Sequence, residues 1–287
     1  MSVQDQEKVR QNVREKYGRI ANDGKTGCKM DPAPSCCGKA SDFLTGNPAT
    51  TCCESPDLSP EQLAQFMGYT NDQLCGIPEG ANMGLGCGNP VALSSLKAGE
   101  TVLDLGAGGG FDCFLAARYV GDSGHVIGVD MTSEMVSKAR LNAEKVSVKN
   151  VEFRLGEIEH LPVADNEVDI ILSNCVINLS PDKSAVFKEV FRVLKPGGRL
   201  AISDIVATKA LPDEIRKNMV LVTSCIGGAA TVEALEKMLV EAGFKKIQIV
   251  PNEESRELIR QWDPHPGKNI ADYVASASIQ AVKPSKE

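Results

Sequence analysis

Short apolar runs and amphipathic stretches alternate along the chain from residue 101 onward. An apolar run of four to six residues with flanking turn residues is typical of a strand, whereas apolar positions repeating every three to four residues indicate a helix. The helical patterns lie near residues 111–120, 133–146, 181–194 and 231–242. The predicted strands are Val102–Leu105, Val126–Val129, Val151–Arg154, Val168–Leu172, Leu200–Ser203 and Lys246–Val250.

This alternation predicts an α/β fold with a doubly wound, mostly parallel sheet. Ser180-Pro181 and Thr231 are expected to start the last two helices, and Gly197 and Gly243 to follow their ends. Residues 272–283 alternate between apolar and polar side chains and predict a last strand beside Lys246–Val250. The intervening residues 251–271 are interpreted as an insertion with a short helix.

The part of the chain before residue 101 is less regular. Residues 5–21 predict an amphipathic helix with Val9, Val13, Tyr17 and Ile20 on one face. Residues 27–60 hold five cysteines and five prolines without apolar periodicity, which is typical of a long irregular arm. Ser59 and Gln62 form a capping box that starts a short helix. We expect an N-terminal extension over residues 1–88, a core over 89–208 and a C-terminal part over 209–287.

Composition narrows the class of protein. The formal net charge of -7 argues against a nucleic-acid surface, which needs clustered Lys and Arg. No apolar run has the length of a membrane span, and the first residues lack the apolar core of a signal peptide, so a cytoplasmic location is expected. Ten cysteines in such a protein favour metal binding or thiol chemistry over a disulfide framework.

A glycine turn follows the first predicted strand, in the stretch Thr101–Cys113. Glycine lets the backbone approach a ligand closely at the carboxyl end of a strand. Asp130 ends the next strand, where a carboxylate can accept from ribose hydroxyls. The dinucleotide fingerprint G-x-G-x-x-G nevertheless fails, because Phe111 stands at its third glycine.

The sequence Asp104-Leu105-Gly106-Ala107-Gly108 instead resembles the class I S-adenosylmethionine-dependent methyltransferases. The resemblance includes Gly156–Glu159 after the third strand and Leu194–Gly198 before the fifth. It implies the Rossmann-like fold of that class, with an antiparallel last strand, and S-adenosylmethionine as methyl donor. For Met131 and Ile158 an ordinary place in the core remains an equal alternative. The residues implied at the donor are Asp104, Gly106, Gly108, Asp130, Met131, Ile158, Glu159 and Asn174.

Three cysteines are placed where they can reach the donor. Cys175 follows the strand Val168–Leu172, although a lone cysteine there is more often a small buried hydrophobe. Cys87 lies in a glycine-rich loop before the core, and Cys225 ends the helical run 212–224. Three thiolates that converge form a soft site, suited to a thiophilic ion. Trivalent arsenic fits this site, because it binds three sulfurs and keeps a lone pair that can attack a methyl group.

The chain also resembles the arsenite methyltransferases over nearly its whole length. The residues that carry this resemblance are Tyr17-Gly18, Ile77–Asn82, Gly84–Pro90, Ser173–Leu179 and Cys225–Ala229. It implies that Cys87, Cys175 and Cys225 bind As(III), and that Cys28 forms a transient disulfide with Cys87 during turnover. The substrates would be thiol complexes of arsenite and methylarsenite, with thioredoxin or glutathione as reductant, and the role arsenic detoxification.

Two alternatives stay open at this point. A carbon or oxygen methyltransferase of quinone or sterol type shares the sheet and the donor residues but does not need these cysteines. A non-catalytic module that binds a metalloid or zinc is the other, although the pairs Cys36-Cys37 and Cys52-Cys53 lack C-x-x-C spacing. For these pairs metalloid capture, a relay role and disorder all remain possible, and His125, His160 and His265 are given no catalytic role.

Overall fold

The computed structural model describes residues 2–23, 59–262 and 269–285. A sheet of seven strands lies at its centre, in the order β3-β2-β1-β4-β5-β7-β6. Only β7 runs antiparallel to its neighbours β5 and β6, so the doubly wound sheet with an antiparallel last strand is confirmed. The strands are β1 (Thr101–Leu105), β2 (His125–Asp130), β3 (Val151–Leu155), β4 (Val168–Asn174), β5 (Leu194–Ala207), β6 (Lys245–Asn252) and β7 (Val274–Val282).

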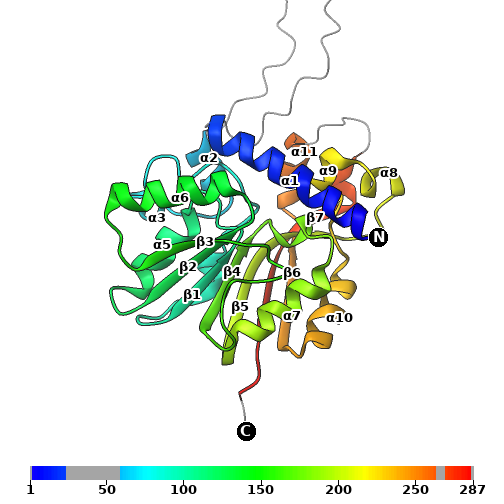
Figure 1. Cartoon of the computed structure of the whole chain (residues 1–287). Coiled ribbons are helices and arrows are strands. Elements are labelled where there is room, and N and C mark those ends of the chain that lie inside the picture. The colour runs from blue at the N-terminus through cyan, green and yellow to red at the C-terminus, as the bar shows by residue number, and fades with distance from the viewer. Residues whose placement is uncertain (1, 24–58, 263–268, 286–287) are drawn as a thin grey trace, which may run out of the picture.

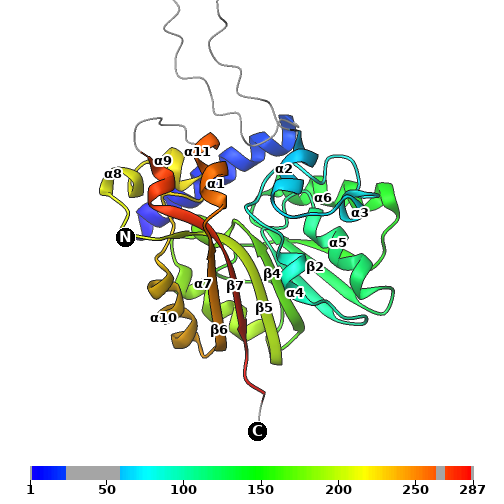
Figure 2. The same ribbon diagram turned by 180° about the vertical axis from the view of Figure 1, so that it is seen from behind.

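Helices cover both faces of the sheet, because successive residues of a strand point to opposite faces. Leu103 and Leu105 of β1 lie in one buried cluster with α7 (Lys183–Val193) and α10 (Val232–Ala242). Val102, the residue before Leu103, lies in a second cluster with α4 (Pro90–Ser94), α5 (Phe111–Val120) and α6 (Ser133–Val146). Figure 1 shows α7 and α10 in front of the sheet, and Figure 2 shows α4 and α5 on the other side.

Most of the remaining helices gather at the edge where the parallel strands end. The long helix α1 (Val3–Asp23) crosses that edge (Figure 1). Its Val9 and Val13 are buried there, and each contributes on the order of 2 kcal/mol of hydrophobic free energy. The other elements outside the sheet layers are α2 (Pro60–Phe66), α3 (Asn71–Leu74), η1 (Ile177–Leu179), α8 (Asp213–Arg216), α9 (Met219–Val222), α11 (Ser255–Trp262) and η2 (Ile270–Asp272).

Several predicted helix ends are confirmed by their capping groups. The Ser59 and Gln62 side chains form the expected capping box of α2. Thr231 caps α10 by accepting from the N–H of Ala234, and Gly243 ends that helix in the left-handed conformation. These caps depend on residues close in the sequence, so the local pattern was sufficient to place them.

Other boundaries were predicted wrongly. The run 212–224 is two short helices instead of one, because the Asn218 side chain accepts from the N–H groups of Val220 and Leu221 and starts a new helix. Helix α7 begins at Lys183, since the carboxylate of Asp182 is its N-cap in place of Ser180-Pro181. Gly197 does not follow α7 directly, because β5 already begins at Leu194.

Candidate active site

The glycine turn between β1 and α5 lies at the carboxyl edge of the sheet. Gly106, Gly108 and Gly110 all adopt left-handed φ angles of 69°, 52° and 92°, a conformation that side chains with a Cβ adopt at a cost. The carboxylate of Asp130 accepts from the N–H groups of Gly108 at 3.0 Å and Thr132 at 2.8 Å. The turn and the end of β2 are thus one continuous surface.

A pair of buried carboxylates lies beneath this turn. Asp104 accepts a hydrogen bond from the Cys113 thiol at 3.2 Å, and Asp112 accepts one from the Tyr69 hydroxyl at 2.6 Å. Burial raises the pKa of Asp104 well above its usual value, and the nearby Asp112 raises it further. Burial also raises the pKa of Asp112 to about 6, although its hydrogen bonds from Tyr69 and Asn174 act in the opposite direction.

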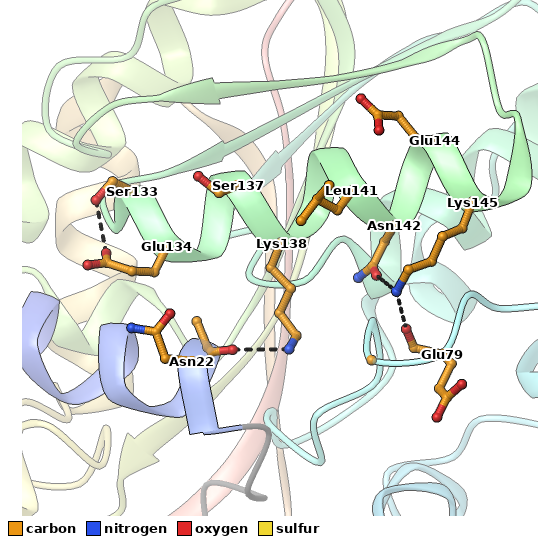
Figure 3. A pocket seen from close by; sticks show the side chains of 12 residues that line it. Asn22, Glu79, Ser133, Glu134, Ser137, Lys138, Leu141, Asn142, Glu144 and Lys145 are labelled. Carbon is orange, nitrogen blue, oxygen red and sulfur yellow. Dashed lines mark hydrogen bonds between the residues drawn. The ribbon is translucent and has the colours of Figure 1, made fainter.

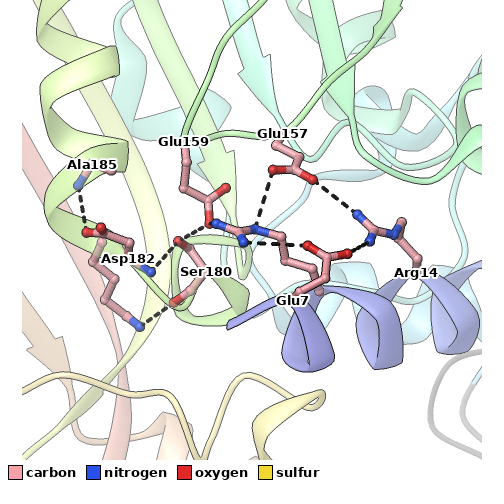
Figure 4. A network of polar contacts seen from close by, with 9 residues as sticks. Glu7, Arg14, Glu157, Glu159, Ser180, Asp182 and Ala185 are labelled. Carbon is pink, nitrogen blue, oxygen red and sulfur yellow. Dashed lines mark hydrogen bonds and ion pairs between the residues drawn. The ribbon is translucent and has the colours of Figure 1, made fainter. Parts of the chain in front are cut away.

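The segment after β3 is held by α1. Arg10 pairs with Glu159 at 3.3 Å and with Glu157 at 3.4 Å, and Arg14 pairs with Glu157 at 3.1 Å. The Ser180 hydroxyl also donates to Glu159 at 2.6 Å (Figure 4). The Glu159 side chain is therefore engaged by the N-terminal helix, and its contact with a methyl donor stays a prediction.

The apolar residues predicted at the donor lie in two different surroundings. Ile158 is buried in the cluster shared with α7 and α10. Met131 is half-buried and packs against the cluster that contains Cys225, together with Cys87 and Cys175. Met131 thus places the end of β2 beside the cysteines, and neither residue has a tested role.

The structure brings the three predicted cysteines of the core together. Cys87 and Cys175 are joined as a disulfide across 88 residues of sequence. The Cys225 thiol donates to the carbonyl oxygen of Cys175 at 2.7 Å. Cys175 and Cys225 both adopt left-handed φ angles, 57° and 64°. Such strain in residues other than glycine is found preferentially at functional sites, so we take this cluster as the candidate active site.

A carboxylate that the sequence analysis missed faces these cysteines. One oxygen of Asp204 and the Sγ atoms of Cys87 and Cys175 lie within 4.8 Å of one another. Burial raises the pKa of Asp204 to about 6, while hydrogen bonds from backbone N–H groups and the charge of Lys183 act against the rise. The signal was available, because Asp204 follows the predicted strand Leu200–Ser203 at the same sheet edge.

The surroundings of Cys225 change the pKa of its thiol. Burial raises the pKa of the thiol well above its usual value, and the Asp204 carboxylate adds to the rise. Lys16, Tyr17 and Lys183 act in the opposite direction. Lys16 also binds the two residues before Cys225: it donates to the carbonyl oxygen of Thr223 at 3.0 Å and to the hydroxyl of Ser224 at 2.8 Å. Helix α1 therefore supplies one of the two positive charges near this thiol, and α7 supplies the other with Lys183.

An open hollow of about 1020 Å³ lies elsewhere, between the end of α1, the segment around Gly80 and the outside of α6. Figure 3 shows Lys138 donating to the carbonyl oxygen of Ala21, and Lys145 donating to that of Glu79. None of the cysteines and none of the predicted donor residues lines it. The hollow therefore lies between α1 and α6 and is separate from the candidate active site.

Comparisons with known proteins agree with this geometry. A family model described as a methyltransferase domain matches residues 96–243. The arsenite methyltransferase of Halobacterium salinarum is 48% identical over 283 residues, which cover 99% of this chain and 68% of the relative. The chain belongs to the arsenite methyltransferase family. It is therefore a methyltransferase of the S-adenosylmethionine-dependent class, and its sheet is the class I fold expected from the sequence.

Two further members of the arsenite methyltransferase family are similar over shorter stretches. The arsenite methyltransferase of Aquipseudomonas alcaligenes is 40% identical over 71% of this chain and 58% of the relative. The crystal structure of an arsenic (III) S-adenosylmethionine methyltransferase from Chlamydomonas reinhardtii matches with 31% identity and a TM-score of 0.55, over 78% of this chain and 72% of that one. These relatives are longer than the chain.

Two other predictions from the sequence, on the cysteines of the arm and on a membrane span, concern residues that the structure describes only in part. Cys28 and the pairs Cys36-Cys37 and Cys52-Cys53 lie outside the described residues. Within residues 2–23, 59–262 and 269–285, no helix combines the length and apolar character that crossing a bilayer requires.

Proposed function

We propose that this protein transfers a methyl group from S-adenosylmethionine to trivalent arsenic held by Cys87, Cys175 and Cys225. The observation that carries the proposal is the meeting of these cysteines, which come from three distant segments, beside the ends of β4 and β5. Arsenite and methylarsenite would arrive as complexes of small thiols and exchange onto the protein. The reaction serves arsenic detoxification.

The residues of the glycine turn fit the methyl donor. Glycine at position 106 lets Val176 pack directly against the turn, and the Asp130 carboxylate keeps acceptor capacity for ribose hydroxyls beyond its two backbone hydrogen bonds. Asp104, Gly106, Gly108, Asp130, Met131, Ile158, Glu159 and Asn174 would surround it. When bound, the donor supplies an electrophilic methyl group on a sulfonium sulfur.

The cysteines contribute soft ligands in apolar surroundings. Thiolate sulfur suits a thiophilic ion better than carboxylate or hydroxyl oxygen does. Three sulfurs hold As(III) as a pyramid whose lone pair stays free to form the As–C bond. No proton leaves arsenic in that step, so no general base is required, and the protein acts mainly by positioning.

Electron balance requires a thiol pair. As the lone pair forms the As–C bond, the bond between the methyl carbon and the sulfonium sulfur would break and S-adenosylhomocysteine would leave, which raises arsenic from the trivalent to the pentavalent state. Two cysteine thiolates that close to a disulfide return two electrons to arsenic, and thioredoxin or glutathione then reduces the disulfide. The disulfide between Cys87 and Cys175 is consistent with Cys87 taking part in such a pair. Cys28 would exchange with Cys87 in the relay.

The test is a labelled methyl transfer. The full chain is incubated with arsenite, a thiol and S-adenosylmethionine labelled in the methyl group, and the arsenic species are separated and identified. We expect methylated arsenic that carries the label. If the arsenic carries no labelled methyl group although the protein binds the donor tightly, a carbon or oxygen methyltransferase would be favoured. Arsenic or zinc binding without donor binding would favour a non-catalytic module.

A second assay addresses the relay. Each methylation removes one sulfur ligand, so fewer thiols are needed for methylarsenite than for arsenite. Cys28→Ser is therefore expected to slow the methylation of arsenite more than that of methylarsenite. Equal loss on both substrates would contradict the relay role of Cys28.

A further inference from the structure

The backbone on both sides of Cys87 is held by one side chain. The Cys87 N–H donates to Oδ1 of Asn174 at 2.9 Å, and Nδ2 of Asn174 donates to the carbonyl oxygen of Gly88 at 2.8 Å. Gly86 has a φ angle of 125°, and a Cβ there would stand 2.9 Å from the Asn174 amide. Glycine at position 86 thus lets the loop lie directly against this amide.

The orientation of the Asn174 amide is determined by its other contacts. Nδ2 also donates to the Tyr69 hydroxyl oxygen at 3.1 Å and approaches an Asp112 carboxylate oxygen at 3.4 Å. Tyr69 donates its own proton to Asp112, so its oxygen is free to accept. With the amide turned over, the NH₂ group would face the Cys87 N–H and the oxygen would face three acceptors. Tyr69 and Asp112 therefore select the orientation that accepts from Cys87.

This chain of hydrogen bonds reaches the donor turn. Asp112 is the second residue of α5, which begins directly after the left-handed Gly110. The Tyr69 side chain is 3% exposed, and its ring packs against that of Phe111 with 4.8 Å between ring centroids. The hydrogen bonds lie inside the protein, where partnered polar groups hold a unique geometry.

We propose that Tyr69 and Asp112 are positioning residues that, through Asn174, fix Cys87 relative to the turn that holds the methyl donor. The inference rests on the proposed function, since it takes Cys87 as an arsenic ligand. Methyl transfer needs the attacking atom in line with the methyl group, and a displacement of about 1 Å costs up to about 100-fold in rate. In this proposal Tyr69 acts through its hydrogen bonds with Asn174 and Asp112.

The test is Tyr69→Phe, which keeps the ring and removes the hydroxyl. We expect kcat for arsenite to fall about tenfold while the KM for S-adenosylmethionine changes less than about twofold. Methylarsenite needs fewer sulfur ligands, so its kcat should change less than about threefold. Tyr119→Phe is the matched control, because Tyr119 is exposed on α5, the helix that carries Asp112, and it should leave both rates unchanged.

The outcomes separate the two proposals. A wild-type protein that methylates neither arsenical would overturn the proposed function. An active wild-type protein with an unchanged Tyr69→Phe variant, or with equal losses on both substrates, would overturn only the positioning role. If Tyr69→Phe does not fold, Asp112→Asn replaces it, because it removes the charge while keeping the shape of the side chain. The same split between arsenite and methylarsenite is then expected.

Discussion

The Cys225 thiol donates a hydrogen bond to the carbonyl oxygen of Cys175, 50 residues earlier in the chain. A serine at position 225 can keep this hydrogen bond but offers arsenic a hard oxygen in place of a soft sulfur. We therefore expect Cys225→Ser to fold, to bind S-adenosylmethionine like the wild type, and to lose at least about 100-fold in the rate of arsenite methylation.

The control for this prediction is Cys75→Ser. Cys75 is exposed and lies outside the cysteine cluster, so the variant should methylate arsenite at the wild-type rate. Rates are measured from the labelled methyl group recovered on arsenic. A Cys225→Ser protein with the wild-type rate would remove Cys225 from the arsenic site.

Gly106 offers a test of the donor turn. Its φ angle is 69°, and a Cβ there would overlap the side chain of Val176. Gly106→Ala is expected to lower the affinity for S-adenosylmethionine about tenfold or more and to cost roughly 2 kcal/mol of stability from the backbone conformation and the overlap. Isothermal titration and thermal unfolding measure the two effects.

Gly121→Ala is the matched control for this variant. Gly121 has a similar φ angle of 65°, but a Cβ there would meet no atom within 4 Å. Because its ψ angle of -174° lies in a region essentially limited to glycine, the control should lose roughly 1–3 kcal/mol of stability but keep its donor affinity. Equal donor affinities in the two variants would show that Gly106 is not part of the donor site.

The raised pKa of Asp204 predicts that the stability of the protein depends on pH. Its pKa is raised to about 6 in the folded protein, so the folded state binds the proton more tightly than the unfolded state does. Ionisation of Asp204 therefore costs stability, and this cost grows as the pH rises from about 4 to about 6 and is constant above that range.

Asp204→Asn removes this cost. Relative to the wild type, the unfolding free energy of the variant should rise by about 2 kcal/mol between about pH 4 and about pH 7. Chemical denaturation at each pH measures it. Asp213→Asn, at an exposed position paired with Lys217, should not show this rise. A constant difference between Asp204→Asn and the wild type would contradict the raised pKa.

The ion pairs of Arg10 are expected to determine how much the packing of α1 on the rest of the protein contributes to stability. Glu159 is only 4% exposed, so loss of Arg10 leaves a buried carboxylate without its cationic partner. Arg10→Gln is expected to cost about 3 kcal/mol of stability, whereas Arg19→Gln, at an exposed position of the same helix, should cost less than about 0.5 kcal/mol. Denaturant unfolding compares them, and equal stabilities would show that the ion pairs of Arg10 do not secure α1.

The sequence was sufficient to predict an element where its contacts are local, and to predict a residue's place where that residue follows a strand of a parallel sheet. The glycine turn, the Thr231 and Gly243 caps and the alternation of strands and helices along the chain all follow from neighbouring residues. The three cysteines could be brought together because each was placed beside the carboxyl edge of a parallel sheet. Their roles in binding arsenic remain predictions.

The sequence was insufficient where distant side chains meet. Nothing near Tyr69 indicates Asp112 and Asn174 as its partners, and nothing near Arg10 indicates Glu159, 149 residues away. The pattern of residues 212–224 is apolar enough for one helix, yet the Asn218 side chain competes for backbone N–H groups and divides it. Long-range polar contacts of this kind leave no periodic trace in a sequence.

The attachment of α1 also bears on the order in which the protein can assemble during synthesis. The helix is made before its partners, since Arg10 binds Glu159 and Lys16 binds Ser224, 208 residues later. The pairing of β1 with β2 and with β4 involves only residues between 101 and 174. A nascent chain can therefore pair β1 with β2 and β4 well before α1 has a surface to bind, whereas the candidate active site can form only after Cys225 has been synthesised.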